Sequence, residues 1–460
     1  MKMNRWLFLV LLLSLLFVMV ASASADENNA TELKELLRVT KELRQRVEQL
    51  EKKLQKYEAK EQQLEAKQQE LEKAKEEVSG IKKALGNLEF AADITMVAQG
   101  TINNDDNAKR AGSEGKDKVD AAWSMDFDIT SKIGESGTGF LKLEAGQGYG
   151  VNDEVGAISG INDDAPETED PTVEVTEAWY EHAFGSVPLV ATVGKVDLTN
   201  YFDANEVAND ETIQFLSSGF VNNMAVEFPD DNGLGSRITY SPTELVDISL
   251  GWGEADSNFE NIVDDGFGIF ELDLKPTLFG KPGNYRVYTW VNGYNHYDTG
   301  DLKDVVDGTK TIGDADDDEN NWGVGFSFDQ IVFKDVALFL RGGIMDDDVV
   351  RYDEDSGELD GPPMKGAISG GFQVGGSYWG RGDDRFAVAF GSVFLDDELE
   401  GEYGLPDDIA DELHLEVYYT LSLFEGGLEF SPDLQVVWNA GGDDNADTVA
   451  VGGVRMQINF

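Results

Sequence analysis

Along residues 89–460, hydrophobic and polar residues alternate in segments of about ten that are separated by turn residues. Because successive side chains of a strand point to opposite faces, each segment carries one apolar row and one polar row. This pattern predicts an all-β transmembrane barrel, with the apolar rows facing lipid and the polar rows facing water. The last segment shows it clearly, since Val454, Met456, Ile458 and the terminal Phe460 alternate with polar residues. We interpret Phe460 as the signal for barrel assembly.

Four further segments assign side chains to a face of the barrel. The side chains predicted to face lipid include Val287, Val291, Trp322, Val324, Leu338, Leu340, Leu415 and Leu421. The side chains predicted to face the interior include Arg286, Tyr288, Trp290, Ser327, Asp329, Arg341, His414, Glu416 and Tyr418.

The spacing of turn residues predicts the number of strands, because such barrels have short periplasmic turns and long outer loops. Seven short turns and eight long loops alternate, which predicts sixteen antiparallel strands with both termini in the periplasm. This count requires Met224–Tyr240 to be one strand, interrupted at Asp230–Asn232. It also places most acidic residues on the outer surface, as at Asp163–Asp170, Asp314–Glu319 and Asp346–Asp355.

The N-terminus has the pattern of a targeting segment. Lys2 and Arg5 precede an apolar run that ends at Val20, and small residues continue to Ala25. This order is typical of a secretory signal peptide, so we assign residues 1–25 to one. No later segment is apolar over the roughly 20 residues that a membrane helix needs. The mature chain is therefore expected to cross the bacterial outer membrane as a closed barrel.

Residues 26–88 form a second region with the heptad spacing of a long α-helical coiled coil. One core position of the heptad is occupied by Leu36, Leu43, Leu50, Tyr57, Leu64, Leu71, Val78 and Leu85. We predict a periplasmic coiled coil, either as a trimerisation stalk or as a tether that touches peptidoglycan.

Composition excludes several classes of function. The chain has no cysteine, which rules out disulfides and thiolate metal sites, and we predict neither metal nor cofactor. Its formal net charge is −53, and residues 91–460 hold 74 acidic against 20 basic residues. Such a charge repels nucleic acid, so a nucleic-acid partner is not expected.

The third outer loop, Thr199–Asn223, is unusually apolar for a segment in water, with eight large hydrophobic side chains. We predict that it folds inward, packs on the barrel wall and narrows the pore. The predicted negative rim consists of Asp203, Glu206, Asp210 and Glu211, opposite lumenal Arg286 and Arg341. Opposed charges across a constriction would orient dipolar solutes. The alternative is that the apolar residues cover a subunit interface.

Aromatic residues on the predicted lumenal face suggest contact with sugars. Aromatic rings bury the apolar face of a pyranose while Arg, Asn and Glu side chains bind its hydroxyls. The candidates are Tyr288, Trp290 and Tyr418, with Trp179 on the same face and Glu416 beside them. Tyr and Trp also form the aromatic belts at membrane interfaces, which is an equally good explanation for residues near strand ends.

Several motifs in order resemble the OprB-type carbohydrate-selective porins. The most distinctive runs from Gly194-Lys195-Val196-Asp197 through Tyr201-Phe202-Asp203 to Gln214-Phe215, and other matches are Gly283-Asn284-Tyr285-Arg286, Glu416 with Tyr418-Tyr419, and Pro432-Asp433-Leu434-Gln435. The resemblance implies a sixteen-stranded, homotrimeric porin in outer-membrane lipid, which passes small sugars by diffusion. The long coiled coil and the extreme acidity depart from simple sugar porins.

Three other functions compete with this interpretation. The acidity favours a general cation-preferring porin. The coiled coil favours a structural protein that tethers the envelope and uses the barrel as a plug. An enzyme is disfavoured, because only three histidines are present and neither a nucleophile elbow nor a zinc-protease motif occurs. His414 beside Glu416 is the single candidate for a general-base pair.

Overall fold

The computed structural model of the chain describes residues 86–104, 116–229, 232–263, 265–278, 280–315, 319–353 and 357–460, with ten separate positions between 38 and 75. Contacts divide the chain into two units, Met1–Gly86 and Asn87–Phe460. The ten described positions between 38 and 75 are helical and exposed. The predicted signal peptide and most of the predicted coiled coil lie outside the described residues, so both stay predictions.

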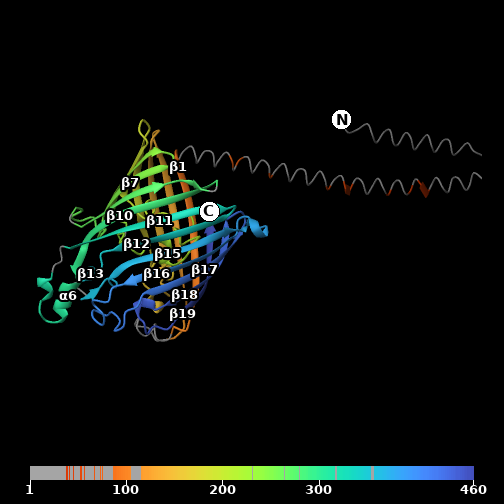
Figure 1. The fold of residues 1–460 in the computed structure, drawn as a ribbon. Helices are drawn as coiled ribbons and strands as arrows, with labels where there is room; N and C mark the ends of the chain where they lie inside the picture. The colour runs from red at the N-terminus through yellow and green to blue at the C-terminus, as the bar shows by residue number, and fades with distance from the viewer. Residues whose placement is uncertain are drawn as a thin grey trace, which may run out of the picture. The chain divides into compact units, whose positions relative to one another are not determined.

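In the described part of the second unit, sixteen strands close an antiparallel barrel (Figure 1). Each strand pairs with its neighbour in sequence, and β1 pairs with β19 to close the wall. The predicted number of strands is confirmed. The strands are β1 (Leu88–Ile102), β2 (Val119–Ile133), β3 (Gly137–Gly148), β4 (Thr168–Phe184), β5 (Leu189–Lys195), β6 (Leu234–Thr243), β7 (Val246–Glu254), β8 (Gly266–Leu274), β10 (Lys281–Asp298), β11 (Glu319–Phe333), β12 (Val336–Met345), β15 (Met364–Gly375), β16 (Arg385–Leu395), β17 (Glu412–Leu423), β18 (Leu428–Trp438) and β19 (Val449–Asn459).

Short helices and strands lie in the connections between these strands. They are β9 (Thr277–Leu278), β13 (Val349–Asp353), β14 (Glu358–Leu359), α4 (Asn152–Val155), α5 (Ser218–Val221), α6 (Thr299–Val306), η1 (Ile312–Asp314), η2 (Gly376–Trp379) and η3 (Ala440–Gly442). Around α6 and β13, the outer loops have a hydrophobic cluster of their own that includes Tyr297, Leu302 and Val350. None of the helices described is long and apolar enough to span a membrane.

The two faces of the wall follow the alternation in sequence. On β12, Leu338 and Leu340 are 44% and 43% exposed, whereas Phe339 and Arg341 are 4% and 0% exposed. On β17, His414 and Glu416 are likewise buried inside the barrel. The predicted inward and outward faces of these strands are confirmed, because a period of two leaves no other assignment once one face is apolar.

The predicted strand Met224–Tyr240 is wrong in its first half. Strand β6 begins at Leu234, and Ala225 and Val226 are buried in the interior instead of pairing with a neighbouring strand. The indole Nε1 of Trp290 donates a hydrogen bond to the carbonyl oxygen of Ala225 at 2.9 Å. These residues pack against the wall without pairing as a strand, so the third outer loop spans residues 196–233 between β5 and β6.

Candidate pore constriction

Loop three, as residues 196–233 are called below, folds into the barrel and packs on its wall through the residues described within 196–229. One cluster joins its Phe202 and Ala225 to Phe267 and Trp290, and a second joins its Phe215 to a further part of the wall. The members of the second cluster are Val207, Ala208, Phe215, Phe220, Ala337, Phe339, Ala387, Ala389 and Tyr418. Burying these apolar side chains removes them from water, which is the force that holds the loop inward. The predicted inward packing is confirmed.

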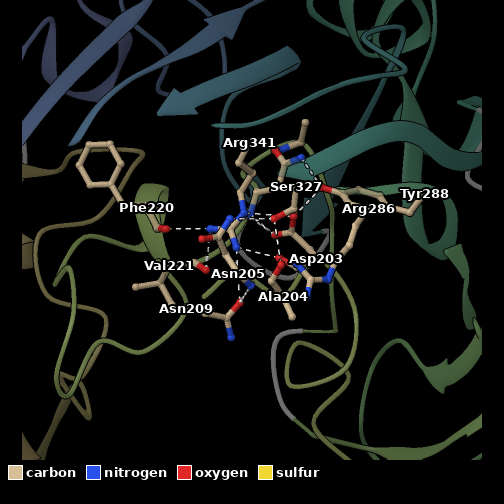
Figure 2. Close-up of polar contacts among 12 residues, drawn as sticks. Asp203, Ala204, Asn205, Asn209, Phe220, Val221, Arg286, Tyr288, Ser327 and Arg341 are labelled. Atoms are coloured by element: carbon tan, nitrogen blue, oxygen red, sulfur yellow. Dashed lines mark hydrogen bonds and ion pairs between the residues drawn. The ribbon is translucent and has the colours of Figure 1, made fainter. Parts of the chain in front are cut away.

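A buried ion pair fixes the loop at its centre (Figure 2). Arg341 Nε lies 3.0 Å from Asp203 Oδ2, and both side chains have no exposed surface. The guanidinium also donates to the carbonyl oxygens of Asp203, Phe220 and Val221 at 2.7, 2.7 and 2.8 Å. A buried pair of charges is tolerated only when further hydrogen bonds satisfy it, as they do here.

The Asp203 carboxylate receives two more hydrogen bonds. Tyr288 Oη donates to Oδ1 at 2.6 Å, and the Asn223 backbone N–H donates to Oδ2 at 2.8 Å. Asp203 and Arg341 were predicted to face each other across the water-filled pore, and this is wrong. Their charges neutralise each other beneath the loop, because a chain that folds onto the wall must satisfy the polar groups it covers.

Other predicted lining residues are anchors for the same reason. Glu416 accepts hydrogen bonds from the backbone N–H groups of Leu216 and Ser217 at 2.6 and 3.0 Å. Tyr288, Trp290 and Tyr418 are all less than 5% exposed. The prediction that these four side chains line the water-filled lumen is wrong in this conformation, since loop three covers them and leaves no face for a solute.

The remaining predicted residues have different surroundings. Arg286 forms ion pairs with two wall residues, with Asp329 at 2.9 Å and Asp273 at 3.7 Å. Glu206 is exposed and lines a cavity of about 540 Å³. Phe460 is 76% exposed at the end of the barrel.

The aqueous lumen lies between loop three and the wall formed by β1, β2 and β3. A cavity of about 750 Å³ is lined by Asp210 and Glu211, and a neighbouring cavity of about 150 Å³ shares part of its lining. The two cavities meet at residues that line both, which we call the constriction ring: Asp126, Lys142, Asp163, Asp197, Glu211 and Thr212.

The ring is strongly acidic. It holds four carboxylates and one ammonium group, and Lys142 Nζ lies 2.8 Å from Asp126 Oδ2. Burial and the neighbouring carboxylates of Asp163 and Asp210 raise the pKa of Glu211 well above its usual range. At the edge of the smaller cavity, burial raises the pKa of the Asp164 carboxyl to about 8.

Sequence reasoning missed the wall side of this ring, and its placement of Asp163 on the outer surface is wrong, because Asp163 lines both cavities. Asp126 and Asp128 flank Phe127 on β2, and Lys142 and Glu144 flank Leu143 on β3. Charged residues that alternate with apolar ones on a membrane strand point to the lumen, so the signal was present. The sequence pattern does not show which part of the wall remains uncovered by loop three.

A closed sixteen-stranded barrel with an inward-folded loop beside a water-filled lumen defines an outer-membrane porin. The chain belongs to the carbohydrate-selective porin family OprB, whose family model matches residues 115–460.

Comparison with one solved structure supports this fold. The high-pH structure of Pseudomonas putida OprB is similar, with a TM-score of 0.65 and 16% identity, covering 81% of this chain and 94% of that one. The outer membrane channel DcaP of Acinetobacter baumannii has a TM-score of 0.47 and 12% identity, covering 81% and 97%. An uncharacterized protein of Aquifex aeolicus (strain VF5) is 28% identical over 151 residues, which are 33% of this chain and 42% of that protein. That alignment thus spans less than half of the relative's length.

Proposed function

We propose that this protein is a porin through which small carbohydrates diffuse passively across the outer membrane. The observation that carries the proposal is the cavity of about 750 Å³ between loop three and the β1–β3 wall. Its size falls in the range of about 300–1,000 Å³ that is typical of small-molecule sites. Membership of the carbohydrate-selective family supports sugars as the solutes.

The lining of this cavity suits hydroxylated solutes. Besides its charged groups it carries amide and hydroxyl side chains, which exchange hydrogen bonds with water and with sugar hydroxyls alike. They are Thr199, Asn200, Asn205, Asn209, Thr212, Gln214, Asn222, Gln457 and Asn459. Transport by diffusion needs contacts that are favourable enough for entry and weak enough for release. Many exchangeable hydrogen bonds meet that requirement.

A general cation-preferring porin is the second candidate. The four carboxylates of the constriction ring against one ammonium group favour it. A ring of carboxylates lowers the energy of a cation in a pore and raises that of an anion. The two candidates differ in whether sugars pass, so they are separable by experiment.

Assembly and anchoring form a further part of the proposal. We propose a homotrimer in outer-membrane lipid, with residues 26–88 as a periplasmic coiled coil that strengthens the trimer or reaches peptidoglycan. The heptad spacing supports the coiled coil. Because the proposed role is passage of solutes, the protein is expected to act as a channel without catalysing a reaction.

Swelling of proteoliposomes tests the carbohydrate function. Vesicles that contain the purified full-length protein are placed in isotonic solutions of a monosaccharide, a disaccharide and a trisaccharide. The swelling rate is expected to fall as the solute grows, because loop three limits the passage. Vesicles without protein give the background. A rate no higher than that background, from protein whose circular dichroism shows folded β-structure, would refute the proposal.

A further inference from the structure

We infer that the carbohydrates this channel favours are cationic ones, namely amino sugars that carry a free ammonium group beside their hydroxyls. This inference rests on the proposed function and specifies its substrate class. It follows from two properties of the lumen that occur together, an uncompensated negative charge at the constriction ring and neutral hydrogen-bonding groups next to it.

The negative charge of the ring is not balanced locally. The Lys142 ammonium is paired with Asp126 at 2.8 Å. Within the described residues, Asp163 and Asp197 form no ion pair; Asp163 accepts a hydrogen bond from Ser218 Oγ at 2.5 Å, and Asp197 accepts hydrogen bonds from the backbone N–H and Oγ1 of Thr199. Glu211 adds little negative charge at neutral pH, because its raised pKa keeps it mostly protonated. Hydrogen bonds from neutral groups hold carboxylates in place but do not neutralise their negative charge.

The surroundings of the ring strengthen this field. Asp93, Asp128 and Asp210 line the larger cavity, and Glu144 and Glu177 line the smaller one. Arg385 is the second basic side chain of the larger cavity, and its guanidinium is paired with Glu429 at 2.5 Å. A lumen with low-dielectric walls focuses such a field and raises the local concentration of cations.

Neutral groups on loop three lie beside the charges. Asn200 Nδ2 lies 3.1 Å from Asp197 Oδ2, so an amide and a carboxylate of the loop are adjacent at the ring. Asn205, Asn209 and Thr212 line the same cavity. A hexosamine presents one ammonium and several hydroxyls to this lining, whereas glucose presents hydroxyls alone and glucuronate is repelled.

The expected preference is modest because the lumen contains water. One unit charge about 4 Å from an opposite charge in water is enriched roughly fivefold. Glucosamine differs from glucose only in an ammonium group at one hydroxyl position, so the two form a matched pair. We therefore expect glucosamine to cross about fivefold faster than glucose at neutral pH and low ionic strength.

The test measures uptake of labelled glucosamine, glucose and glucuronate by proteoliposomes that contain the full-length protein. The ring variant Asp163→Asn/Asp197→Asn should bring glucosamine and glucose close to equal rates. The matched control Glu135→Gln/Glu244→Gln removes two carboxylates from exposed periplasmic turns and should keep the preference. Lys142→Gln should increase the preference, which keeps the test valid if the ring variant fails to fold.

The outcomes separate this inference from the proposed function. Faster uptake of glucosamine that disappears in the ring variant, and in salt near 1 M where the screening length is about 3 Å, supports the inference. Equal rates for glucosamine and glucose overturn it and leave a neutral-sugar porin. A preference that persists in the ring variant overturns the assignment to these carboxylates. Uptake of no sugar at all would refute the proposed function itself.

Discussion

Replacing Arg341 by methionine should release loop three from the wall. The substitution keeps most of the side-chain volume but removes the ion pair with Asp203 and the hydrogen bonds to three loop carbonyl groups. Breaking a buried pair by removing one partner typically costs about 3–5 kcal/mol, because the other charge is left buried and unpaired. Here the cost destabilises the state in which loop three is docked on the wall, because Asp203 and Arg341 are both buried in that state.

This magnitude predicts a visible change in the channel. Since about 1.4 kcal/mol corresponds to a factor of ten, the fraction of molecules with an undocked loop should rise between roughly a hundredfold and a few thousandfold. The strands of the wall pair with one another and do not depend on this ion pair, so we expect the barrel itself to fold normally. The single-channel current should become larger and noisier than that of the wild-type protein.

Single-channel recording in planar bilayers measures this effect. Arg286→Met is the matched control, because Arg286 is also a lumenal arginine but its ion pairs stay within the wall. The double variant Asp203→Asn/Arg341→Met should recover part of the loss, since no unpaired buried charge remains. Current from Arg341→Met that matches the wild type in size and noise would refute the role of this ion pair.

Three further predictions concern other parts of the chain. First, the pKa of Glu211 is raised well above its usual range and that of Asp164 to about 8. A carboxyl is neutral below its pKa and charged above it, so the cation selectivity of the channel should rise from pH 6 to pH 9. Reversal potentials in a KCl gradient that do not change with pH would contradict this. Second, Phe460→Ser should lower the yield of assembled barrel in the outer membrane, measured by heat-modifiable migration on gels, and an unchanged yield would count against an assembly role. Third, deletion of residues 31–85 should leave a conducting barrel but reduce its co-sedimentation with cell-wall material, and full co-sedimentation of the shortened protein would dispose of the tether.

The barrel was predictable from the sequence because its rule is local. Alternation with a period of two fixes the face of every side chain, so Leu340 is outward and Arg341 inward without any knowledge of the fold. Short turns and long loops then give the number of strands. The same rule failed at Met224–Phe228, where apolar residues pack on the inner wall without forming a strand.

The site was less predictable because it depends on contacts between distant segments. The sequence showed that loop three is apolar and that Arg341, Tyr288 and Glu416 point inward. Whether an inward side chain meets water or a loop depends on where the loop lies, and Asp203 and Arg341 are 138 positions apart. Polar residues that looked suited to bind a solute instead satisfy the backbone of loop three. The open part of the lumen is therefore lined by Asp126 and Lys142 on the opposite wall.

Single-channel recording of the purified full-length protein in planar bilayers, titrated with glucose, tests most directly that the lumen is an open channel for solutes. The account predicts stepwise openings whose current falls as glucose occupies the constriction and recovers when the glucose is removed. Folded protein that inserts but gives no openings would contradict it and would indicate a closed barrel that anchors the envelope.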